Sequence, residues 1–276
     1  MGQSLKNWIF ACKSCGFLMS SLQPRIEASS FDTSIDEGSR FNALEQLRIN
    51  NFRRILTQLS TIAPAHGKRL LDVGCAHGWF LDIATQLGFI VNGIEPDPGI
   101  SILAAKSDRR VWQGFFPDDL PEDQRFDVIV FNDVFEHLPY PSQAIAACHH
   151  LLEKGGILVI NIPNSNGVFY RLAELLSRLG ISTPLERMWQ KQFPSPHLSY
   201  FNPSQLKQLA EENGFIECHR STLPSIELKG LWTRLRYDRS TSFLYSALVW
   251  LGVVAFFPLI RILPADISLQ MFRKLG

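Results

Sequence analysis

The chain lacks an excess of charge of either sign. Its 276 residues carry 27 lysines and arginines against 26 aspartates and glutamates, so the formal net charge is +1 at pH 7. A protein whose main partner is nucleic acid needs a basic surface to neutralise phosphates, and the balanced charge therefore argues against such a partner. The length suffices for one large α/β core with an appended segment.

The sequence contains few cysteines, and its first residues do not show the pattern of a secretory signal. Of the five cysteines only Cys12 and Cys15 lie close together in sequence, which does not make a disulfide framework. The first ten residues show neither a long apolar core nor a cleavage site, so we expect no secretory signal. Both observations favour a reducing compartment, and we expect a cytoplasmic protein.

Strand-like and helix-like segments alternate through the middle of the chain. Apolar residues at helical spacing predict an amphipathic helix over 40–60, after an irregular segment at 1–38. The expected strands that follow are 68–73, 89–95, 109–114, 126–132 and 156–162, and the expected helices are 78–87, 98–106, 140–152 and 166–179. A further helix is expected at 203–213 and a further strand at 215–222. This alternation, with apolar strand runs, predicts a parallel sheet covered by helices on both faces.

A glycine-bounded turn follows the first strand of this sheet. The run 69–73 carries Asp72 near its end, and Gly74-x-x-x-Gly78 leads into an apolar helix. In an open α/β sheet a nucleotide-like ligand binds at the carboxyl ends of the strands, where glycines let the backbone approach it closely. The spacing differs from the Gly-x-Gly-x-x-Gly pattern of dinucleotide binders, which argues against a nicotinamide-dependent oxidoreductase.

Polar residues also end the next strands. Glu95 ends the second strand, where an acid can accept hydrogen bonds from two ribose hydroxyls. Gly114 and Phe115 follow the third strand and could frame an adenine ring, although Phe115 could equally belong to the core. Asn132 and Asp133 end the fourth strand. We expect these strand ends to converge on one ligand.

These motifs, in this order, resemble the class I methyltransferases that use S-adenosylmethionine (SAM). Within that group the chain is similar to methyltransferase family 23 and to the ubiquinone-biosynthesis O-methyltransferases. The resemblance includes a His-x-x-x-Phe-[ST]-Pro element before a helix that ends in Gly-Phe, which stands here as His197 to Pro203 with Gly214-Phe215 later. Asn202 replaces the commoner hydroxyl residue and can still cap the helix. The similarity covers about residues 40 to 274.

The resemblance implies a fold, a cofactor and a set of site residues. The fold would be a Rossmann-like, mostly parallel seven-stranded sheet with helices on both faces, an N-terminal helical cap and an apolar helical insertion before the last strand. The cofactor would be SAM, held by Asp72, Gly74, Cys75, Gly78, Glu95, Gly114, Phe115, Asn132 and Asp133. His137 is the first candidate for a general base, because imidazole titrates near neutrality, and His197 is the second. Either histidine could instead serve only to order the pocket.

The pair Cys12-x-x-Cys15 is half of a zinc-binding pattern. A structural zinc ion needs four ligands, and the remaining cysteines are single residues in or near the expected core. The stretch 8–17 resembles the second half of a zinc ribbon found in some relatives, whose first Cys-x-x-Cys pair is missing here. We expect no metal.

An apolar segment interrupts the end of the chain. Residues 240–260 contain no charged residue and are long enough to span a bilayer, with Arg234, Arg236, Arg239 and Arg261 around them. The segment could span a membrane, lie in its interface or cover the core. Residues 265–274 resemble the family's last strand, and a span before them would separate two strands of one sheet across the bilayer. We therefore favour peripheral membrane contact through 240–263.

Four regions follow from this interpretation. They are an N-terminal segment at 1–38, a SAM-binding core at 39–223, the apolar insertion at 224–264 and the final strand at 265–276. The predicted function is methyl transfer from SAM to a small-molecule, sugar or lipid-linked acceptor, with oxygen as the preferred nucleophile. Methylation of carbon, or a non-catalytic scaffold at a membrane, remain the alternatives.

Overall fold

A computed structural model describes residues 3–24, 37–228, 230–236, 242–260 and 262–276. It contains two sheets, one of seven strands and one of four. The larger sheet has the order β10-β11-β8-β7-β4-β5-β6, and only β11 runs antiparallel to its neighbours. Its strands are β4 (Arg69–Val73), β5 (Ile90–Glu95), β6 (Arg110–Gln113), β7 (Phe126–Asn132), β8 (Leu152–Pro163), β10 (Phe215–Leu223) and β11 (Ile267–Lys274). This confirms the predicted mostly parallel seven-stranded sheet.

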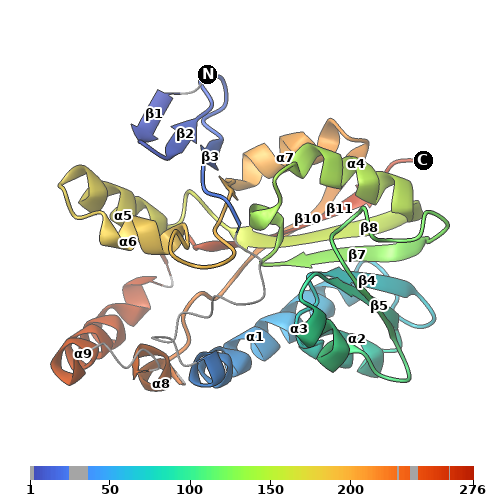
Figure 1. Cartoon of the computed structure of the whole chain (residues 1–276), viewed down its shortest axis with the longest axis horizontal. Helices are drawn as coiled ribbons and strands as arrows, with labels where there is room; N and C mark the ends of the chain where they lie inside the picture. Colours follow the sequence, from blue (N-terminus) through green and yellow to red (C-terminus); the bar gives the residue numbers. More distant parts are fainter. Residues whose placement is uncertain (1–2, 25–36, 229, 237–241, 261) are drawn as a thin grey trace.

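Helices cover both faces of the sheet (Figure 1). One face carries α1 (Glu37–Ser60), α2 (Trp79–Gln86) and α3 (Pro98–Ala104), and the other carries α4 (Pro141–Leu151) and α7 (Pro203–Glu211). A hydrophobic core lies on each face of the sheet, because successive side chains of β7 point to opposite faces. Val128 and Val130 pack toward α1 and α2, whereas Ile129 and Phe131 pack toward α4 and α7. Burial on both faces accounts for the continuous apolar runs in the sequence.

The remaining elements surround the end of the sheet where the parallel strands finish. They are the short helix η1 (Phe135–His137) after β7, α5 (Val168–Arg178), α6 (Thr183–Met188) and β9 (Ser199–Tyr200), together with α8 (Leu231–Arg236) and α9 (Phe243–Ile260) before the last strand. In Figure 1 α5, α6, α8 and α9 lie together on the left of the molecule, beyond the sheet.

The sequence predicted an irregular N-terminal segment, and the structure shows that this prediction was wrong. Residues 3–20 form β1 (Gln3–Lys6), β2 (Ile9–Ala11) and β3 (Leu18–Ser20), which pair as an antiparallel sheet with β9. Their signal was weak because the strands are very short and β9 comes from a distant part of the chain. Trp8 packs edge-on against Trp189, with ring centroids 5.9 Å apart, so packing between distant segments stabilises this small sheet.

The strand predicted at 156–162 begins earlier in the structure. The strand begins at Leu152, directly after α4, and Phe126 pairs with Leu152 while Val128 pairs with Ile157. Residues 153–156 therefore bulge out of the ladder, and Gly155 has a φ of 73°. Gly155 and Gly156 therefore belong to a bulge inside β8 and not to a turn before it.

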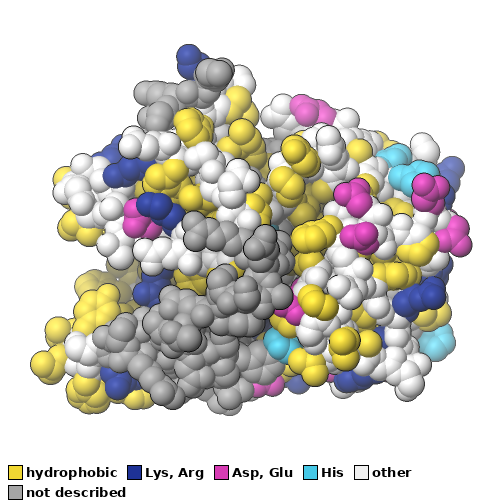
Figure 2. All heavy atoms as spheres, in the orientation of Figure 1, with side chains coloured by type: hydrophobic (Ala, Val, Ile, Leu, Met, Phe, Trp, Pro, Cys, Tyr) yellow, Lys and Arg dark blue, Asp and Glu magenta, His cyan; other side chains and the backbone are white. Residues whose placement is uncertain are grey.

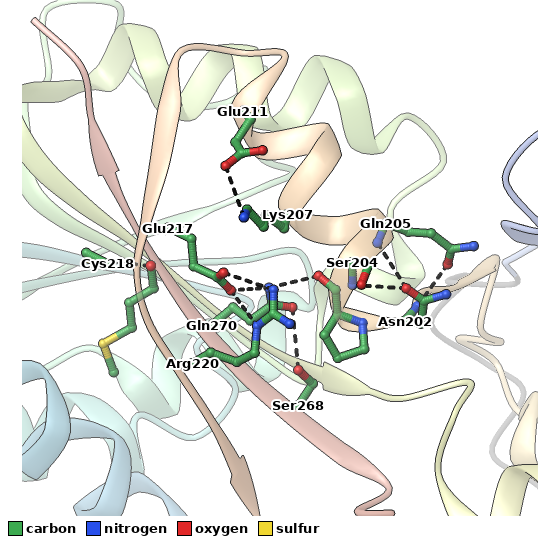
Figure 3. Close-up of polar contacts among 12 residues, drawn as sticks. Asn202, Ser204, Gln205, Lys207, Glu211, Glu217, Cys218, Arg220, Ser268 and Gln270 are labelled. Atoms are coloured by element: carbon green, nitrogen blue, oxygen red, sulfur yellow. Dashed lines mark hydrogen bonds and ion pairs between the residues drawn. The ribbon is translucent and has the colours of Figure 1, made fainter.

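A polar network joins α7 to the antiparallel strands (Figure 3). Asn202 caps α7, as the sequence predicted, and forms a capping box with Gln205 (Figure 3). The fully buried Gln270 of β11 donates from Nε2 to the carbonyl oxygen of Pro203 at 3.0 Å and to Oε1 of Glu217 at 2.7 Å. These bonds satisfy a buried amide and fix the start of α7 over the sheet.

The insertion before β11 is helical and apolar on its surface. Large exposed side chains of α9 are Phe243, Leu244, Tyr245, Leu248, Leu251, Phe256 and Leu259. Figure 2 shows hydrophobic side chains gathered at the lower left, where α9 lies in Figure 1. Across the described ranges, no helix combines the length and the hydropathy that crossing a membrane requires.

Candidate active site

A cavity of about 770 Å³ opens at the carboxyl ends of the parallel strands. Its volume lies within the range of about 300–1,000 Å³ that is typical of small-molecule sites. Nine of the predicted site residues line it: Asp72, Gly74, Cys75, Glu95, Gly114, Phe115, Asn132, Asp133 and His137. Gly78 and His197 are outside this lining. The structure thus brings together residues that are up to 65 positions apart in sequence, from Asp72 to His137.

The turn after β4 requires glycine at its first position. Gly74 has a φ of 68°, and a Cβ there would lie 2.6 Å from Cγ2 of Val134. Gly78 also has a positive φ, of 78°, and it caps α2 rather than lining the cavity. Its carbonyl oxygen accepts a hydrogen bond from Nη1 of Arg109 at 3.2 Å. Cys75 is buried and packs against Gly93 of β5.

Asp72 and Asn132 form a buried pair on neighbouring strands. Nδ2 of Asn132 donates to Oδ1 of Asp72 at 3.1 Å. Burial raises the pKa of Asp72 to about 8, although the hydrogen bond from Asn132 opposes the shift. Oδ1 of Asn132 has no partner among the described residues. A buried acceptor without a donor is a place where a ligand can bind.

The carboxylate of Glu95 is held by two backbone N–H groups, one in the turn after β4 and one just after β5. Its Oε2 accepts the backbone N–H of Ala76 at 3.0 Å, and its Oε1 accepts that of Asp97 at 3.1 Å. Burial raises the pKa of Glu95, and the two backbone donors oppose the shift. Each carboxylate oxygen has two lone pairs, so one remains on each oxygen for an external donor.

The other predicted cofactor residues lie at the rim of the same cavity. Gly114 has a φ of 144°, and a Cβ there would overlap Asp119. The backbone N–H of Phe115 donates to Oδ2 of Asp119 at 2.7 Å, and the Phe115 ring is 52% exposed. Phe115 is therefore not a core residue, and its ring is available to a planar ligand. Asp133 has a φ of 55°, and burial raises its pKa while Arg48 opposes the shift.

His137 lies on the wall of the cavity in a defined orientation. Its Nδ1 is 2.9 Å from the carbonyl oxygen of Pro196, which can only accept, so Nδ1 carries the proton. The lone pair of Nε2 is then free to accept a proton. Burial lowers the pKa of His137, and the imidazole is therefore neutral at pH 7.

His197 lies behind His137. The two rings have centroids 4.8 Å apart, and the side chain of Gln190 contacts Nε2 of His197 at 2.8 Å. Burial lowers the pKa of His197 well below its usual range, and the neighbouring His137 adds to the shift. Glu136 is buried beside it, with Oε1 3.9 Å from Nε2 of His197, and burial raises its pKa. Ligand atoms of Glu136, His137 and His197 lie within 4.8 Å of one another, a spacing that a metal ion could bridge.

Sequence reasoning missed the residues that α1 contributes. Arg48 and Phe52 line the cavity, although this helix precedes the sheet. The signal was present, because Arg48 interrupts the apolar stripe formed by Phe41, Leu44, Phe52 and Ile55. A charged residue on the face that a helix turns toward the protein indicates a site rather than a core.

Comparisons with known proteins agree with this geometry. Residues 44–216 match a family model described as a methyltransferase domain. A curated relative from Thiobacillus denitrificans, named ubiquinone biosynthesis O-methyltransferase, is 28% identical over 186 residues, which cover 65% of this chain and 76% of the relative. One of the same name from Pseudomonas syringae pv. tomato is 33% identical over 147 residues, covering 50% of this chain and 61% of the relative.

Solved structures share the fold at low sequence identity. A SAM-dependent methyltransferase from Archaeoglobus fulgidus has a TM-score of 0.54 and 17% identity, and the alignment covers 85% of this chain and 99% of that one. Magnesium protoporphyrin IX methyltransferase from Synechocystis, solved with bound S-adenosylhomocysteine, has a TM-score of 0.55 and 12% identity, covering 84% and 86%.

Proposed function

Because this chain belongs to the methyltransferase domain family that matches its residues 44–216, and is a SAM-dependent methyltransferase, we propose that it methylates an oxygen atom of a small-molecule, sugar or lipid-linked acceptor. The single observation that carries the proposal is the cavity in which Glu95, Asp72 and Asn132 converge with His137. The first three suit a cofactor, and the fourth suits proton removal from an acceptor.

The cavity residues fit SAM. The two free lone pairs of Glu95 can accept the two ribose hydroxyls, since its other lone pairs are already bound to backbone N–H groups. The unpartnered Oδ1 of Asn132 can accept from the ammonium group of the cofactor. Asp72 and Asp133 place acidic groups near a ligand whose sulfonium and ammonium groups are positive, and Arg48 lines the same cavity for its carboxylate.

The protein contributes orientation and proton transfer. When bound, SAM supplies a methyl group attached to a positively charged sulfur, which a nucleophile can displace directly. We assign the general-base role to His137, because its neutral Nε2 can accept the proton of an acceptor hydroxyl. The carbonyl of Pro196 fixes the ring and stabilises the proton on Nδ1. His197 supports this ring from behind and does not itself reach the cavity lining.

The choice of an oxygen acceptor rests on two observations. One is the neutral, oriented imidazole, which a hydroxyl nucleophile requires more than an activated carbon does. The other is that the curated relatives are named O-methyltransferases. Transfer to carbon is the competing outcome of the test.

We also propose that α9 contacts the surface of a membrane. Its exposed side chains are almost all apolar, including Leu244, Leu248 and Leu251 at 74%, 69% and 56% exposure. An apolar helix preceded by arginines suits the boundary between head groups and acyl chains. All five cysteines are free thiols, which supports a place on the cytoplasmic face of that membrane.

The function is tested by transfer of an isotopically labelled methyl group from SAM into the lipids and glycans of a cell extract. The proposal expects a labelled product that requires the enzyme, and mass fragmentation should place the label on oxygen. A label on carbon, or no labelled product with an extract that contains the acceptor pools, would contradict it.

The membrane contact has a separate test with a matched control. Leu244, Leu248 and Leu251 are replaced together by serine, and the control replaces Ile102 and Leu103 of α3, which are 73% and 65% exposed, in the same way. Cosedimentation with vesicles of phosphatidylcholine and phosphatidylglycerol should fall at least tenfold for the α9 variant only. Equal sedimentation of both variants and the parent chain would remove the proposal.

A further inference from the structure

The turn that carries Cys12 and Cys15 is well defined. The backbone N–H of Cys12 donates to the carbonyl of Phe17 at 2.8 Å, and that of Gly16 donates to the carbonyl of Cys12 at 2.9 Å. Gly16 has a φ of 71°, which closes the turn. Two hydrogen-bonded backbone contacts therefore hold both thiols on one short loop between β2 and β3.

This loop is fixed to the body of the protein. Nε2 of Gln205 in α7 donates to the carbonyl oxygen of Cys15 at 2.7 Å. Phe17 packs on Phe201 with ring centroids 4.5 Å apart. The same Gln205 belongs to the capping box of α7 (Figure 3). Its bond to Cys15 therefore attaches the loop to a rigid helix terminus. The two thiols are thus preorganised, which lowers the entropic cost of binding a ligand.

The surroundings of Cys12 favour its charged form. The Ser14 hydroxyl lies 3.0 Å from its sulfur, and this contact, with backbone N–H groups of Cys15 and Ser14, lowers the pKa of Cys12 to about 6. The neighbouring Cys15 side chain also lowers the pKa of Cys12. The thiolate is the form that binds metals.

Both thiols are exposed at the surface, and the site that they start is incomplete. Among the described residues, the only cluster of three or more metal-ligating side chains is the one formed by Glu136, His137 and His197, which does not include Cys12 or Cys15. Zinc in structural sites takes four ligands, and thiolates with the spacing Cys-x-x-Cys commonly supply two of them. At this loop, the described residues of one chain therefore supply two of the four ligands.

In contrast to the expectation from the sequence that no metal is bound, we propose that two copies of this chain share one zinc ion, with Cys12 and Cys15 of each copy as its four ligands. The exposure of both thiols allows two such loops to meet, because nothing in the described part of the chain covers them. In Figure 1 the sheet formed by β1, β2 and β3 projects from the body near the amino terminus, where a second copy can approach it.

The chemistry of assembly balances without a redox step. Four zinc–sulfur bonds replace the zinc–water bonds of the hydrated ion, whose waters return to the solvent together with the protons still held by the thiols, so binding weakens as the pH falls. Four thiolates around one Zn²⁺ leave two surplus negative charges. Lys13 lies in the same exposed loop, so each copy brings one positive charge to the centre.

The experiment measures zinc content and mass together. The full chain is purified under reducing conditions, equilibrated with a small excess of ZnSO₄ and freed of unbound metal. Zinc is then counted by mass spectrometry, and the molar mass is measured by light scattering after size exclusion. Variants Cys12→Ser and Cys15→Ser test the ligands, and Cys218→Ser is the control because this partly exposed thiol lies on β10, outside the loop.

The proposal expects one zinc per two chains and a doubled mass, both lost in Cys12→Ser and Cys15→Ser and kept in Cys218→Ser. A chelator should return the dimer to monomer. Cobalt in place of zinc should show the absorption of a tetrahedral four-thiolate site in the dimer fraction. One zinc per monomer, zinc retained by both loop variants, or no zinc bound under these conditions would each overturn it.

Discussion

The side-chain amide of Asn132 donates to the carboxylate of Asp72 across two adjacent parallel strands, with 3.1 Å between Nδ2 and Oδ1. This contact joins the end of β4 to the end of β7 and orients both side chains at the floor of the cavity. It leaves one oxygen of Asn132 without a donor and one carboxylate in a buried position. The polar floor of the site is therefore prepared for a positively charged ligand.

The buried Asp72 predicts that SAM affinity depends on pH. Its pKa in the free protein is raised by burial to about 8, so it is mainly protonated at pH 7. Because a cationic ligand favours the carboxylate, affinity should rise with pH toward about 8 and change by up to about tenfold per pH unit below that. Calorimetry from pH 6 to pH 9 measures this slope, and Asp72→Asn should flatten it. An equal slope in the variant would contradict this role.

The same residue affects the stability of the free protein. An acid whose folded-state pKa is raised contributes fully to stability below its unfolded value, about 3.9, and this contribution is lost as the pH rises through the folded value, about 8. The melting temperature without cofactor should therefore fall across this range more steeply in the parent chain than in Asp72→Asn. Thermal scans at several pH values in one ionic strength provide the comparison.

Removing the charge of Glu95 should weaken cofactor binding strongly. Glu95→Gln loses an acceptor for a ribose hydroxyl and places an amide where two backbone N–H groups donate. Hydrogen bonds to charged groups contribute about 1.5–3 kcal/mol, which corresponds to a loss of affinity of roughly 10- to 100-fold. Glu122→Gln, at an exposed position, is the matched control. If both variants bind SAM like the parent, Glu95 does not hold the ribose.

The turn at Gly74 should not tolerate a side chain. Gly74→Ala adds a Cβ 2.6 Å from Cγ2 of Val134 in a backbone with a φ of 68°. Gly67→Ala is the matched control, because its φ of 74° is similar and no atom lies within 4 Å of the added Cβ. The control should lose about 1 kcal/mol of unfolding free energy from backbone strain, and Gly74→Ala about 1–3 kcal/mol more from the clash. Urea denaturation measures the unfolding free energy of both variants. Equal losses in Gly74→Ala and Gly67→Ala would exclude the clash.

His137 should affect catalysis and not cofactor binding. General-base catalysis contributes about 10²- to 10⁴-fold, so His137→Gln should lower kcat by that factor while the dissociation constant of SAM changes little. His150→Gln on the exposed side of α4 is the control. If kcat is unchanged in His137→Gln, the ring only orders the loop, which was the alternative that the sequence left open.

The parallel sheet and the glycine turn could be predicted because local patterns determine them. The strand run Val128–Phe131 is apolar on both faces, and Gly74 has a φ of 68°, which glycine adopts without strain. The convergence of Asp72, Glu95 and Asn132 followed from the rule that parallel strands end at one edge. No contact across the chain was needed for these predictions.

The N-terminal sheet and the role of α1 depend on distant contacts. The strands of 3–20 are stabilised by β9 and Trp189, about 180 residues away, so a local pattern could not reveal them. Arg48 left a local signal as a charge within an apolar stripe, but its neighbours Asp133 and His77 belong to other elements. The positions of His137 and His197 relative to each other likewise follow from the docking of residues 195–200 on η1.

Titration of SAM into the purified chain by calorimetry tests the central claim most directly. One SAM should bind per chain, and the affinity should drop at least tenfold in Glu95→Gln and stay unchanged in Glu122→Gln. Absence of binding at millimolar SAM to a chain shown to be folded would contradict the assignment of this cavity as the cofactor site.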